Sequence, residues 1–319
     1  MIRLSAGTAA CLGLKTNRMD AYPTTAYLLS GNRCLMSCAF CPQGMVESGE
    51  ISRLGRITWP EYAWSEVEKA LSLAPVRGIE RICLQSVRHQ NGIAPLLDQI
   101  RRLKAISPLP LSLSAWIGSA EEAEALVACG VDRLAIAIDV VNPTYYTQIK
   151  GGSLSERTTL LFDCADKLPG RMTTHLICGL GESEEELITF SNSLFHVNIT
   201  IALFAFVPLK NTRLENADPP PLAQYRRLQA ALFLLKKQSI TLKDLKFFEG
   251  RLVSINLNAD RLKEILQTGE AFQTSGCPGC NRPYYNERPG GIIYNYHRPL
   301  SNPEAVAAVD LVLKTTSNG

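Results

Sequence analysis

The stretch Cys34-Leu35-Met36-Ser37-Cys38-Ala39-Phe40-Cys41 places three thiols within eight residues. It comes shortly after residues 25–30, an apolar run typical of a buried β-strand. In barrels built from parallel strands, the loops at the carboxyl ends of the strands carry the chemistry. The position of the thiols therefore predicts that residues 25–30 begin a parallel sheet and that the following loop holds a functional site.

Short apolar runs alternate with amphipathic segments from residue 24 to residue 207, a pattern that predicts parallel strands joined by helices. An open doubly wound sheet would have a dinucleotide fingerprint after its first strand, but the thiol loop stands there instead. We therefore expect an α/β fold, a partial (βα)6 TIM-like barrel with a C-terminal extension. The expected strands are residues 25–30, 81–85, 109–115, 133–139, 173–178 and 199–207.

Three helices have a clear expected start, because a hydroxyl side chain is followed three residues later by glutamate. These starts are Thr58, Ser119 and Ser183, and Gly130 is expected to end the helix that begins at Ser119 in a left-handed conformation. The pattern divides the chain into an N-terminal segment (1–23), the barrel core (24–216) and the extension (217–319). In the extension we expect helices at residues 222–237, 259–268 and 303–314 and a strand at 251–256.

Charge and hydropathy argue against two classes of partner. The formal net charge is +3, and no long basic run is present, so neither nucleic acid nor an acidic membrane surface is indicated. No window approaches the roughly 20 apolar residues that a membrane span requires. The N-terminus also lacks the apolar core of a secretory signal, so we expect a cytoplasmic protein.

The chain has ten cysteines, and their distribution indicates metal binding. Close groups of thiols in a cytosolic chain are typical of metal ligands rather than disulfides. Three thiolates with C-x3-C-x2-C spacing can hold three corners of a cubane iron–sulfur cluster and leave one iron for another molecule. A zinc site, which needs four ligands, and coincidence are the alternatives.

The stretch from Cys34 to Cys41 resembles the signature of the radical S-adenosylmethionine (SAM) enzymes, which have a partial or full βα barrel with the cluster loop after the first strand. The resemblance implies a 4Fe–4S cluster held by Cys34, Cys38 and Cys41. In that family the free iron binds SAM, and an electron from the cluster cleaves SAM to a 5′-deoxyadenosyl radical. An electron donor such as ferredoxin or flavodoxin is also implied.

Residues 175–182 are similar to the family's SAM-binding motif G-x-I-x-G-x-x-E, with His175 in place of the first glycine. Glycines at a strand end let the backbone approach a ligand closely, so we expect Ile177, Gly179 and Gly181 to contact SAM. A plain strand-to-helix turn is the alternative. Residues 204–212 resemble the segment that lines the adenine pocket of biotin-synthase-like enzymes.

Two further SAM contacts are expected. Phe40 stands next to the last cysteine of the loop, within the signature. Asp139 ends the fourth expected strand, where a carboxylate can accept ribose hydroxyls. A turn-initiating role for Asp139, just before Asn142-Pro143, is the alternative.

The pair Cys277-Pro278-Gly279-Cys280 lies in a Gly/Pro-rich tail. In a chain that already handles an iron–sulfur cluster, we expect the pair to bind an auxiliary cluster; a redox pair or spare thiols are the alternatives. Cys83 resembles a ligand of the sulfur-donating cluster of biotin synthase, and Cys11 could instead meet the tail. Either thiol could also be a buried small apolar residue.

The tail CPGCNRPYYNERPGG resembles the C-terminal motif of the two-component (archaeal-type) lipoyl synthases. The cysteines of biotin synthase on the third and fifth strands, and the N-terminal cysteine set of ordinary lipoyl synthase, are missing. The resemblance implies a sulfurtransferase that uses a sacrificial auxiliary cluster to thiolate the octanoyl chain of a lipoyl-carrier protein, in lipoate biosynthesis, together with a second radical SAM subunit. Tail side chains that could orient the cluster or substrate, or only fix the coil, are Arg282, Tyr284, Tyr285, Asn286, Glu287 and Arg288.

Two other functions remain open from the sequence. One is a different biotin synthase-like radical SAM enzyme that acts on a small amino-acid-like substrate. The other is a metal-binding scaffold without enzymatic activity.

Overall fold

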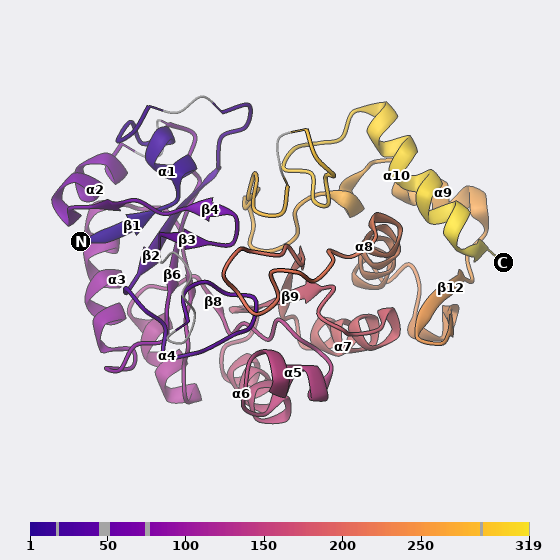
Figure 1. The fold of residues 1–319 in the computed structure, drawn as a ribbon, viewed down its shortest axis with the longest axis horizontal. Helices are drawn as coiled ribbons and strands as arrows, with labels where there is room; N and C mark the ends of the chain where they lie inside the picture. The colour runs from indigo at the N-terminus through magenta and orange to yellow at the C-terminus, as the bar shows by residue number, and fades with distance from the viewer. Residues whose placement is uncertain (17–18, 45–51, 74–76, 288–289, 319) are drawn as a thin grey trace.

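Six parallel strands form the body of an eight-stranded sheet in the computed structural model, which describes residues 1–16, 19–44, 52–73, 77–287 and 290–318. The strands follow one another across the sheet in chain order, as in a βα barrel (Figure 1). The sheet ends at the sixth of these strands, so within the described residues the barrel stays partial, as predicted. The six strands are β2 (Thr25–Ser30), β6 (Arg81–Ser86), β7 (Leu111–Ser114), β8 (Arg133–Ala135), β9 (Met172–Cys178) and β10 (Thr200–Ala205).

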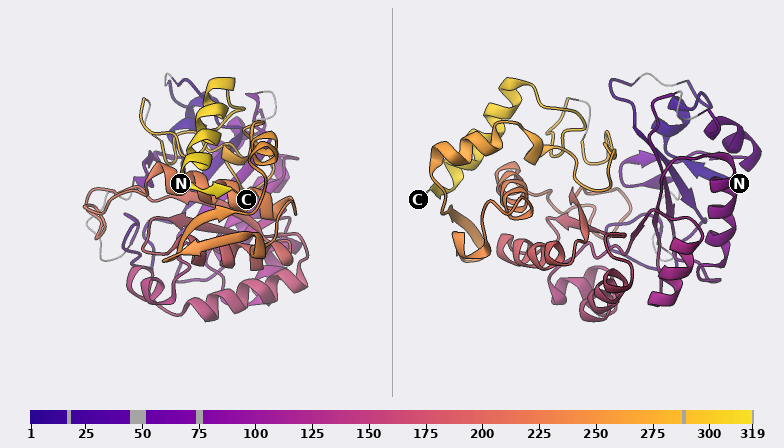
Figure 2. Two further views of the ribbon diagram at one scale, coloured as in Figure 1. Left: turned by 90° about the vertical axis from the view of Figure 1, so that its right-hand side faces the viewer. Right: turned by 180° about the vertical axis from the view of Figure 1, so that it is seen from behind.

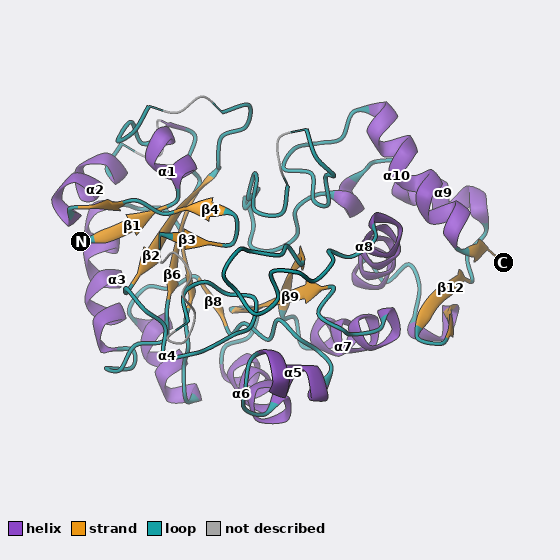
Figure 3. Ribbon diagram, viewed as in Figure 1, coloured by secondary structure: helices purple, strands orange, loops and turns teal. Residues whose placement is uncertain are grey.

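Helices cover the outer side of this sheet, and Figure 3 shows them as a purple layer around the orange strands. Their apolar faces pack against the strands in one large core. We find no helix in the described part of the chain that has both the length and the apolar composition to cross a membrane. The helices that connect the strands are α2 (Trp64–Leu71), α3 (Ala94–Ile106), α4 (Ala120–Ala128), α5 (Pro143–Ile149), α6 (Leu154–Lys167) and α7 (Glu184–His196).

Two of the three expected helix starts are confirmed. The hydroxyls of Ser119 and Ser183 accept hydrogen bonds from the third backbone N–H group of α4 and α7, and Gly130 follows α4 with a φ of 115°. The start predicted at Thr58 is wrong, because Thr58 lies in the short strand β4 (Ile57–Thr58). Helix α2 begins later, where the N–H of Ala63 donates to the Glu66 carboxylate at 2.9 Å.

The sheet continues beyond β2 with two short antiparallel strands that the sequence pattern did not indicate. Strand β1 (Ile2–Leu4) pairs with β2, and β5 (Glu61–Tyr62) pairs with β1. Glu61 and Tyr62, which follow the start predicted at Thr58, therefore form an edge strand of the sheet instead of the first turn of a helix. A further short hairpin connects β3 (Arg53–Leu54) to β4.

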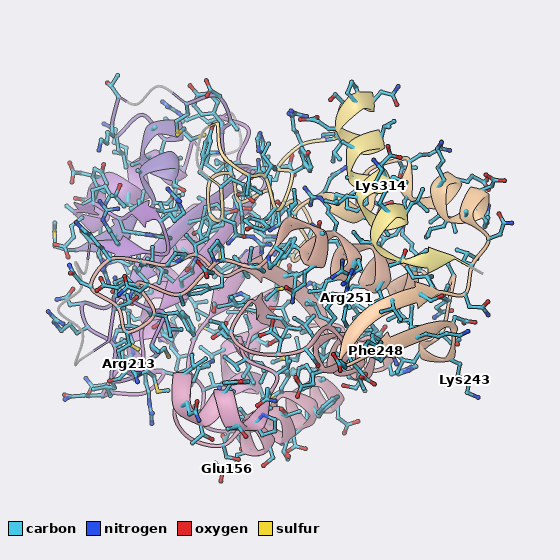
Figure 4. All side chains as sticks on the ribbon, turned by 45° about the vertical axis from the view of Figure 1, so that its right-hand side comes forward. Glu156, Arg213, Lys243, Phe248, Arg251 and Lys314 are labelled. Atoms are coloured by element: carbon cyan, nitrogen blue, oxygen red, sulfur yellow. The ribbon has the colours of Figure 1, made fainter. Side chains whose placement is uncertain are left out.

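The C-terminal extension packs beside the β10 side of the sheet, and Figure 2 shows the two termini at opposite ends of the long axis. Its predicted helices and strand are present as α8 (Leu222–Lys236), α9 (Ala259–Leu266), α10 (Asn302–Thr315) and β12 (Arg251–Ile255). Strand β12 also pairs with β11 (Leu245–Phe248) and β13 (Ser317–Asn318). Phe248, 67% exposed, and Arg251 mark the β11–β12 hairpin in Figure 4.

The tail of the extension crosses the open side of the barrel between β10 and β2. On the β10 side, the N–H of Leu203 donates to the hydroxyl of Ser275 at 3.0 Å, and the Asn286 amide donates to the carbonyl of Ala205 at 2.7 Å. On the β2 side, the N–H of Thr24 donates to the side chain of Asn281 at 3.0 Å. The tail therefore completes the inner wall that the missing strands leave open.

Candidate active site

One cavity of about 340 Å³ lies on the inner side of the sheet and contains both groups of thiols predicted as metal ligands. Segments from opposite ends of the chain meet there, because the tail closes the open side of the barrel. The predicted SAM contacts Phe40, Asp139 and Ile177 also line this cavity. Its six thiols belong to Cys34, Cys38, Cys41, Cys83, Cys277 and Cys280.

The loop after β2 is held by backbone hydrogen bonds that aim its thiols at the cavity. The sulfur of Cys34 accepts the N–H of Arg88 at 3.3 Å and that of Met36 at 3.5 Å. The N–H of Cys41 donates to the carbonyl of Cys38 at 3.0 Å, which closes a tight turn between these two thiols. Hydrogen bonds from backbone N–H groups hold the sulfur of Cys34 in place and are compatible with a metal-bound thiolate.

Burial disfavours that anion as long as no cation is nearby. Burial raises the pKa of Cys38 to about 11 and raises that of Cys41 further above its ordinary range. Thiols with such pKa values lose their protons when a metal takes their place. Within the described residues, no three His, Cys, Asp or Glu side chains already lie close enough to hold a single metal ion. The features of the loop that suit a cluster are the spacing of its thiols, the hydrogen bonds to Cys34 and the burial of Cys38 and Cys41.

The second group of thiols combines the tail with the second parallel strand. Cys83 of β6 faces the cavity beside Cys277 and Cys280, and burial raises the pKa of Cys83 and of Cys277. Cys11 lies elsewhere, at the end of α1 (Ala6–Cys11), where its thiol donates to the carbonyl of Arg77 at 3.4 Å. The structure thus brings Cys83 rather than Cys11 to the tail pair.

Asp139 lines the cavity and forms an ion pair with Lys150. Its backbone has a φ of 63°, and its carboxylate receives the ammonium group of Lys150 at 2.7 Å. Lys150 also donates to the carbonyls of Ala137 and Ile138, at 2.6 and 3.1 Å. Burial alone would lower the pKa of Lys150, but the neighbouring Asp139 charge raises it above its ordinary value. The ammonium charge of Lys150 is therefore present at neutral pH. The ribose contact predicted for Asp139 stays a prediction.

The turn after β9 contains the predicted glycines. A Cβ on Gly179 would lie 2.9 Å from Pro220, and one on Gly181 would lie 2.8 Å from the ring of Tyr145. Both residues also have positive φ angles, 102° and 101°. Packing of Pro220 and Tyr145 against the turn therefore explains both glycines. In contrast to Ile177, neither glycine lines the cavity, and a contact of either with SAM stays a prediction.

His175 occupies the place of the first glycine in this motif and lines the cavity. Its ring meets that of Phe204 edge to face, with centroids 5.4 Å apart. Burial lowers the pKa of His175 to about 4, an effect that the nearby Asp139 charge only partly opposes. The imidazole is therefore neutral at physiological pH, and it is bulkier than the glycine of the motif.

Comparison with known proteins decides the family. The model of the radical SAM superfamily matches residues 28–194, more than half of the chain. The chain belongs to the radical SAM superfamily. Membership implies an enzyme with a 4Fe–4S cluster and SAM, and the three partly buried thiols of the loop after β2, which line one cavity, fit that cluster.

Individual relatives of this radical SAM protein are distant. The biotin synthase of Streptococcus agalactiae is 24% identical over 198 residues, with 60% of this chain and 57% of the relative covered. The GTP 3′,8-cyclase of Limosilactobacillus fermentum is 24% identical over 189 residues, with 57% and 53% covered. The chain thus spans about half the length of the curated relatives it matches.

Solved structures share the fold. The FeFe-hydrogenase maturase HydG of Carboxydothermus hydrogenoformans superposes with a TM-score of 0.55 and 15% identity, covering 92% of this chain and 67% of that one. Methylornithine synthase (PylB) superposes with a TM-score of 0.53 and 14% identity, covering 75% and 67%. At this identity the likeness establishes the radical SAM barrel and no specific reaction.

One side of the cavity, which the sequence did not indicate, is cationic and consists of Arg88, Trp116 and Arg157. We call it the cationic wall. The guanidinium groups of Arg88 and Arg157 both pack on the ring of Trp116, with their carbons 4.3 and 4.0 Å from its centroid. Arg88 and Trp116 each follow the carboxyl end of a strand by two residues, a position that could have marked them. Two cations held by one aromatic ring can bind an anionic group such as a carboxylate.

The tail side chains divide between the two roles considered for them. Arg282, Tyr285 and Asn286 line the cavity. Glu287 instead accepts the N–H groups of Asn295 and Asn286, at 2.8 and 3.2 Å, and so fixes the coil. The ring of Tyr284 packs near His297, at a centroid distance of 6.3 Å. Arg288 lies outside the described residues.

Proposed function

We propose that this radical SAM enzyme inserts sulfur into an unactivated carbon, with the octanoyl chain of a lipoyl-carrier protein as its substrate in lipoate biosynthesis. In this proposal Cys83, Cys277 and Cys280 hold an auxiliary iron–sulfur cluster that is consumed as the sulfur source. One observation carries the proposal: a second group of three thiols faces the same cavity as the loop of Cys34, Cys38 and Cys41. A radical formed at the first group would find a source of sulfur across that cavity.

When bound, the first cluster and SAM would supply the radical that removes hydrogen, and the auxiliary cluster would supply sulfide. The chain's own residues then hold and orient the reactants. Asp139 and Lys150 form an ion pair that lines the cavity, and Arg88 and Arg157 on the ring of Trp116 offer cations to a carboxylate. The remaining walls are mostly apolar, which suits an alkyl chain and keeps water from a radical. Apolar lining residues include Leu29, Leu54, Val87, Phe204, Phe206 and Leu209.

The proposal includes three partners. The octanoylated lipoyl-carrier protein presents the substrate, a second radical SAM lipoyl synthase subunit completes the two-component enzyme, and a ferredoxin or flavodoxin delivers electrons. The tail from Cys277 onward supports the first two, because it resembles the two-component lipoyl synthases in sequence.

Iron and sulfide counts on anaerobically reconstituted protein test the two sites first. We expect about eight irons per chain, the content of two cubane clusters. Cys83→Ala and Cys280→Ala should each reduce this to about four, because each removes a ligand of the auxiliary site. Cys11→Ala is the matched control and should keep the full content, since Cys11 bonds to Arg77 away from the cavity. A full count in Cys83→Ala would contradict its role as a ligand.

The reaction itself is tested with an octanoylated lipoyl-domain peptide and mass spectrometry, with and without the second subunit. Cys38→Ala should abolish cleavage of SAM, because the first cluster loses a ligand. Cys280→Ala should leave SAM cleavage largely intact but add no sulfur to the peptide. If Cys280→Ala still thiolated the peptide at the normal rate, the proposed sulfur source would be wrong.

The cationic wall supports a second candidate, a biotin synthase-like enzyme for a small amino-acid-like substrate. Arg88 and Arg157 offer two positive charges at one side of the cavity, where the carboxylate of such a substrate could bind. This candidate predicts about four irons per chain and no added sulfur in the peptide assay. The same two measurements therefore separate the candidates.

A further inference from the structure

The second thiol group is built on a row of three residues across the sheet. Tyr27 of β2 is the register partner of Cys83 of β6, and Cys83 is in turn the partner of Ser112 of β7. Residues in matched register on neighbouring strands point to the same face of a sheet. The tail pair meets the two ends of this row: Cys280 lies against Tyr27, and Cys277 lies against Ser112. We call these three residues the hydroxyl–thiol row.

The hydroxyl of Tyr27 is placed to donate a hydrogen bond to Cys280. Its oxygen is 3.3 Å from the sulfur of Cys280 and accepts the backbone N–H of Arg282 at 3.1 Å. A phenol has one proton to give, and the N–H of Arg282 occupies a lone pair rather than that proton. A thiolate bound to iron has no proton, so the hydrogen bond between these two atoms runs from Tyr27 to Cys280.

Ser112 repeats the arrangement at the other end of the row. Its oxygen is 3.4 Å from the sulfur of Cys277 and accepts a proton of the Arg81 guanidinium at 2.9 Å. The serine proton therefore remains available for the sulfur. Arg81 also donates to the carbonyl of Pro278 at 3.0 Å, so the same side chain orients the hydroxyl and the turn that carries the thiol.

We propose that Tyr27 and Ser112 are positioning residues of the auxiliary site, each donating a hydrogen bond to one thiolate of the Cys277–Cys280 pair and thereby raising the reduction potential of the cluster. This inference rests on the auxiliary cluster of the proposed function. Hydrogen bonds to ligand sulfur stabilise the reduced, more negative state of a cluster more than the oxidised state. Both donors are buried, 2% and 5% exposed, so water does not compete with these bonds.

The test uses the full chain with Cys34→Ala, Cys38→Ala and Cys41→Ala, so that only the auxiliary cluster can bind. In this background, Tyr27→Phe and Ser112→Ala each remove one hydroxyl and keep the rest of the side chain. Redox titration followed by electron paramagnetic resonance should show a reduction equilibrium constant roughly tenfold lower in each variant, about 59 mV for a one-electron couple. Ser112→Thr keeps a hydroxyl and should restore most of the potential.

Two matched controls remove hydroxyls from the same cavity that form no hydrogen bond to a thiol among the described residues. Tyr285→Phe loses a hydroxyl that accepts a hydrogen bond from Gln85 at 3.1 Å, although its ring lies only 5.4 Å from that of Tyr27. Ser114→Ala changes the next residue of β7 on the same face, which also lines the cavity. Both controls should leave the potential of the auxiliary cluster unchanged.

The outcomes separate this inference from the proposed function. If the background chain binds no iron although its circular dichroism shows a folded protein, the auxiliary cluster and the proposed function fail together with this inference. If iron binds but the potentials of Tyr27→Phe and Ser112→Ala match those of the controls, the inference fails and the proposed function stands. Loss of iron in Tyr27→Phe but not in Tyr285→Phe would support the positioning role, because only the first hydroxyl meets a ligand sulfur.

Discussion

Replacing Lys150 with methionine tests how much the Lys150–Asp139 ion pair in the cavity contributes to stability. Lys150 is 5% exposed in its side chain and pairs with Asp139, which is 12% exposed. Methionine keeps the apolar volume of the lysine stem but removes the ammonium group. The carboxylate of Asp139 and the carbonyls of Ala137 and Ile138 then lose the donor that they share.

The size of the effect follows from this burial. Breaking a buried ion pair from one side costs about 3–5 kcal/mol, because an uncompensated charge is left behind. Asp139 borders the cavity, where water can partly solvate it, so we expect about 3–4 kcal/mol for Lys150→Met. Adding Asp139→Asn removes the stranded charge and should recover about 1–2 kcal/mol, since neighbouring groups in one network are not additive.

Urea unfolding of the apo protein under anaerobic conditions, followed by circular dichroism, measures these free energies. Lys167→Met is the matched control, because Lys167 pairs with Glu121 at 3.0 Å while the two side chains are 40% and 74% exposed. An exposed pair contributes little, so the control should unfold almost as the parent does. If Lys150→Met lost no more stability than Lys167→Met, the stabilising role of the buried Lys150–Asp139 pair would be refuted. The same variant should also cleave SAM more slowly, because Asp139 loses its fixed position.

Two further predictions concern the turn and strand around the cavity. The fold keeps His175 neutral with a pKa of about 4, whereas His175 in the unfolded chain takes up a proton below its ordinary pKa of 6.5. The free energy of unfolding should therefore fall by about 2 kcal/mol between pH 7 and pH 5. Urea midpoints should depend less steeply on pH in His175→Phe. An equally steep dependence in that variant would contradict the assignment. Gly181→Ala should destabilise the protein more than Gly151→Ala in thermal unfolding. Both positions have positive φ, which costs an alanine about 1–2 kcal/mol, but only at Gly181 does the new Cβ also meet Tyr145 at 2.8 Å.

The barrel strands could be predicted from the sequence because each is a short apolar run, and two of the connecting helices have their own start signal. Ser183 illustrates this, since its hydroxyl and Glu186 form the predicted capping box. The same signal misled at Thr58, because Thr58 pairs with β3 and the following strand β5 pairs with β1. Strands β1 and β5 have three and two residues, too short to show a periodicity. Tertiary pairing, rather than local preference, decides such segments.

The site was predictable where a few residues close in sequence carry the chemistry. The first thiol loop is one contiguous stretch, so its spacing alone indicated the cluster. The sequence favoured Cys83 only slightly over Cys11, because the path of the tail decides which of them it meets. Lys150 and Trp116 were missed for a similar reason. Their roles depend on partners, Asp139 for one and two arginines for the other, that long-range packing brings to them.

Closing the barrel and building the second thiol group are one structural event. An open sheet leaves unpaired backbone groups on its last strand, here β10, and Ser275 and Asn286 of the tail bind two of them. The segment between these two anchors contains Cys277 and Cys280, so fixing the edge places both thiols opposite Cys83. The superfamily match ends at residue 194, before this tail begins. The matched part contains the loop of Cys34, Cys38 and Cys41, whereas Cys277 and Cys280, the proposed ligands of the auxiliary cluster, lie in the segment that closes the barrel.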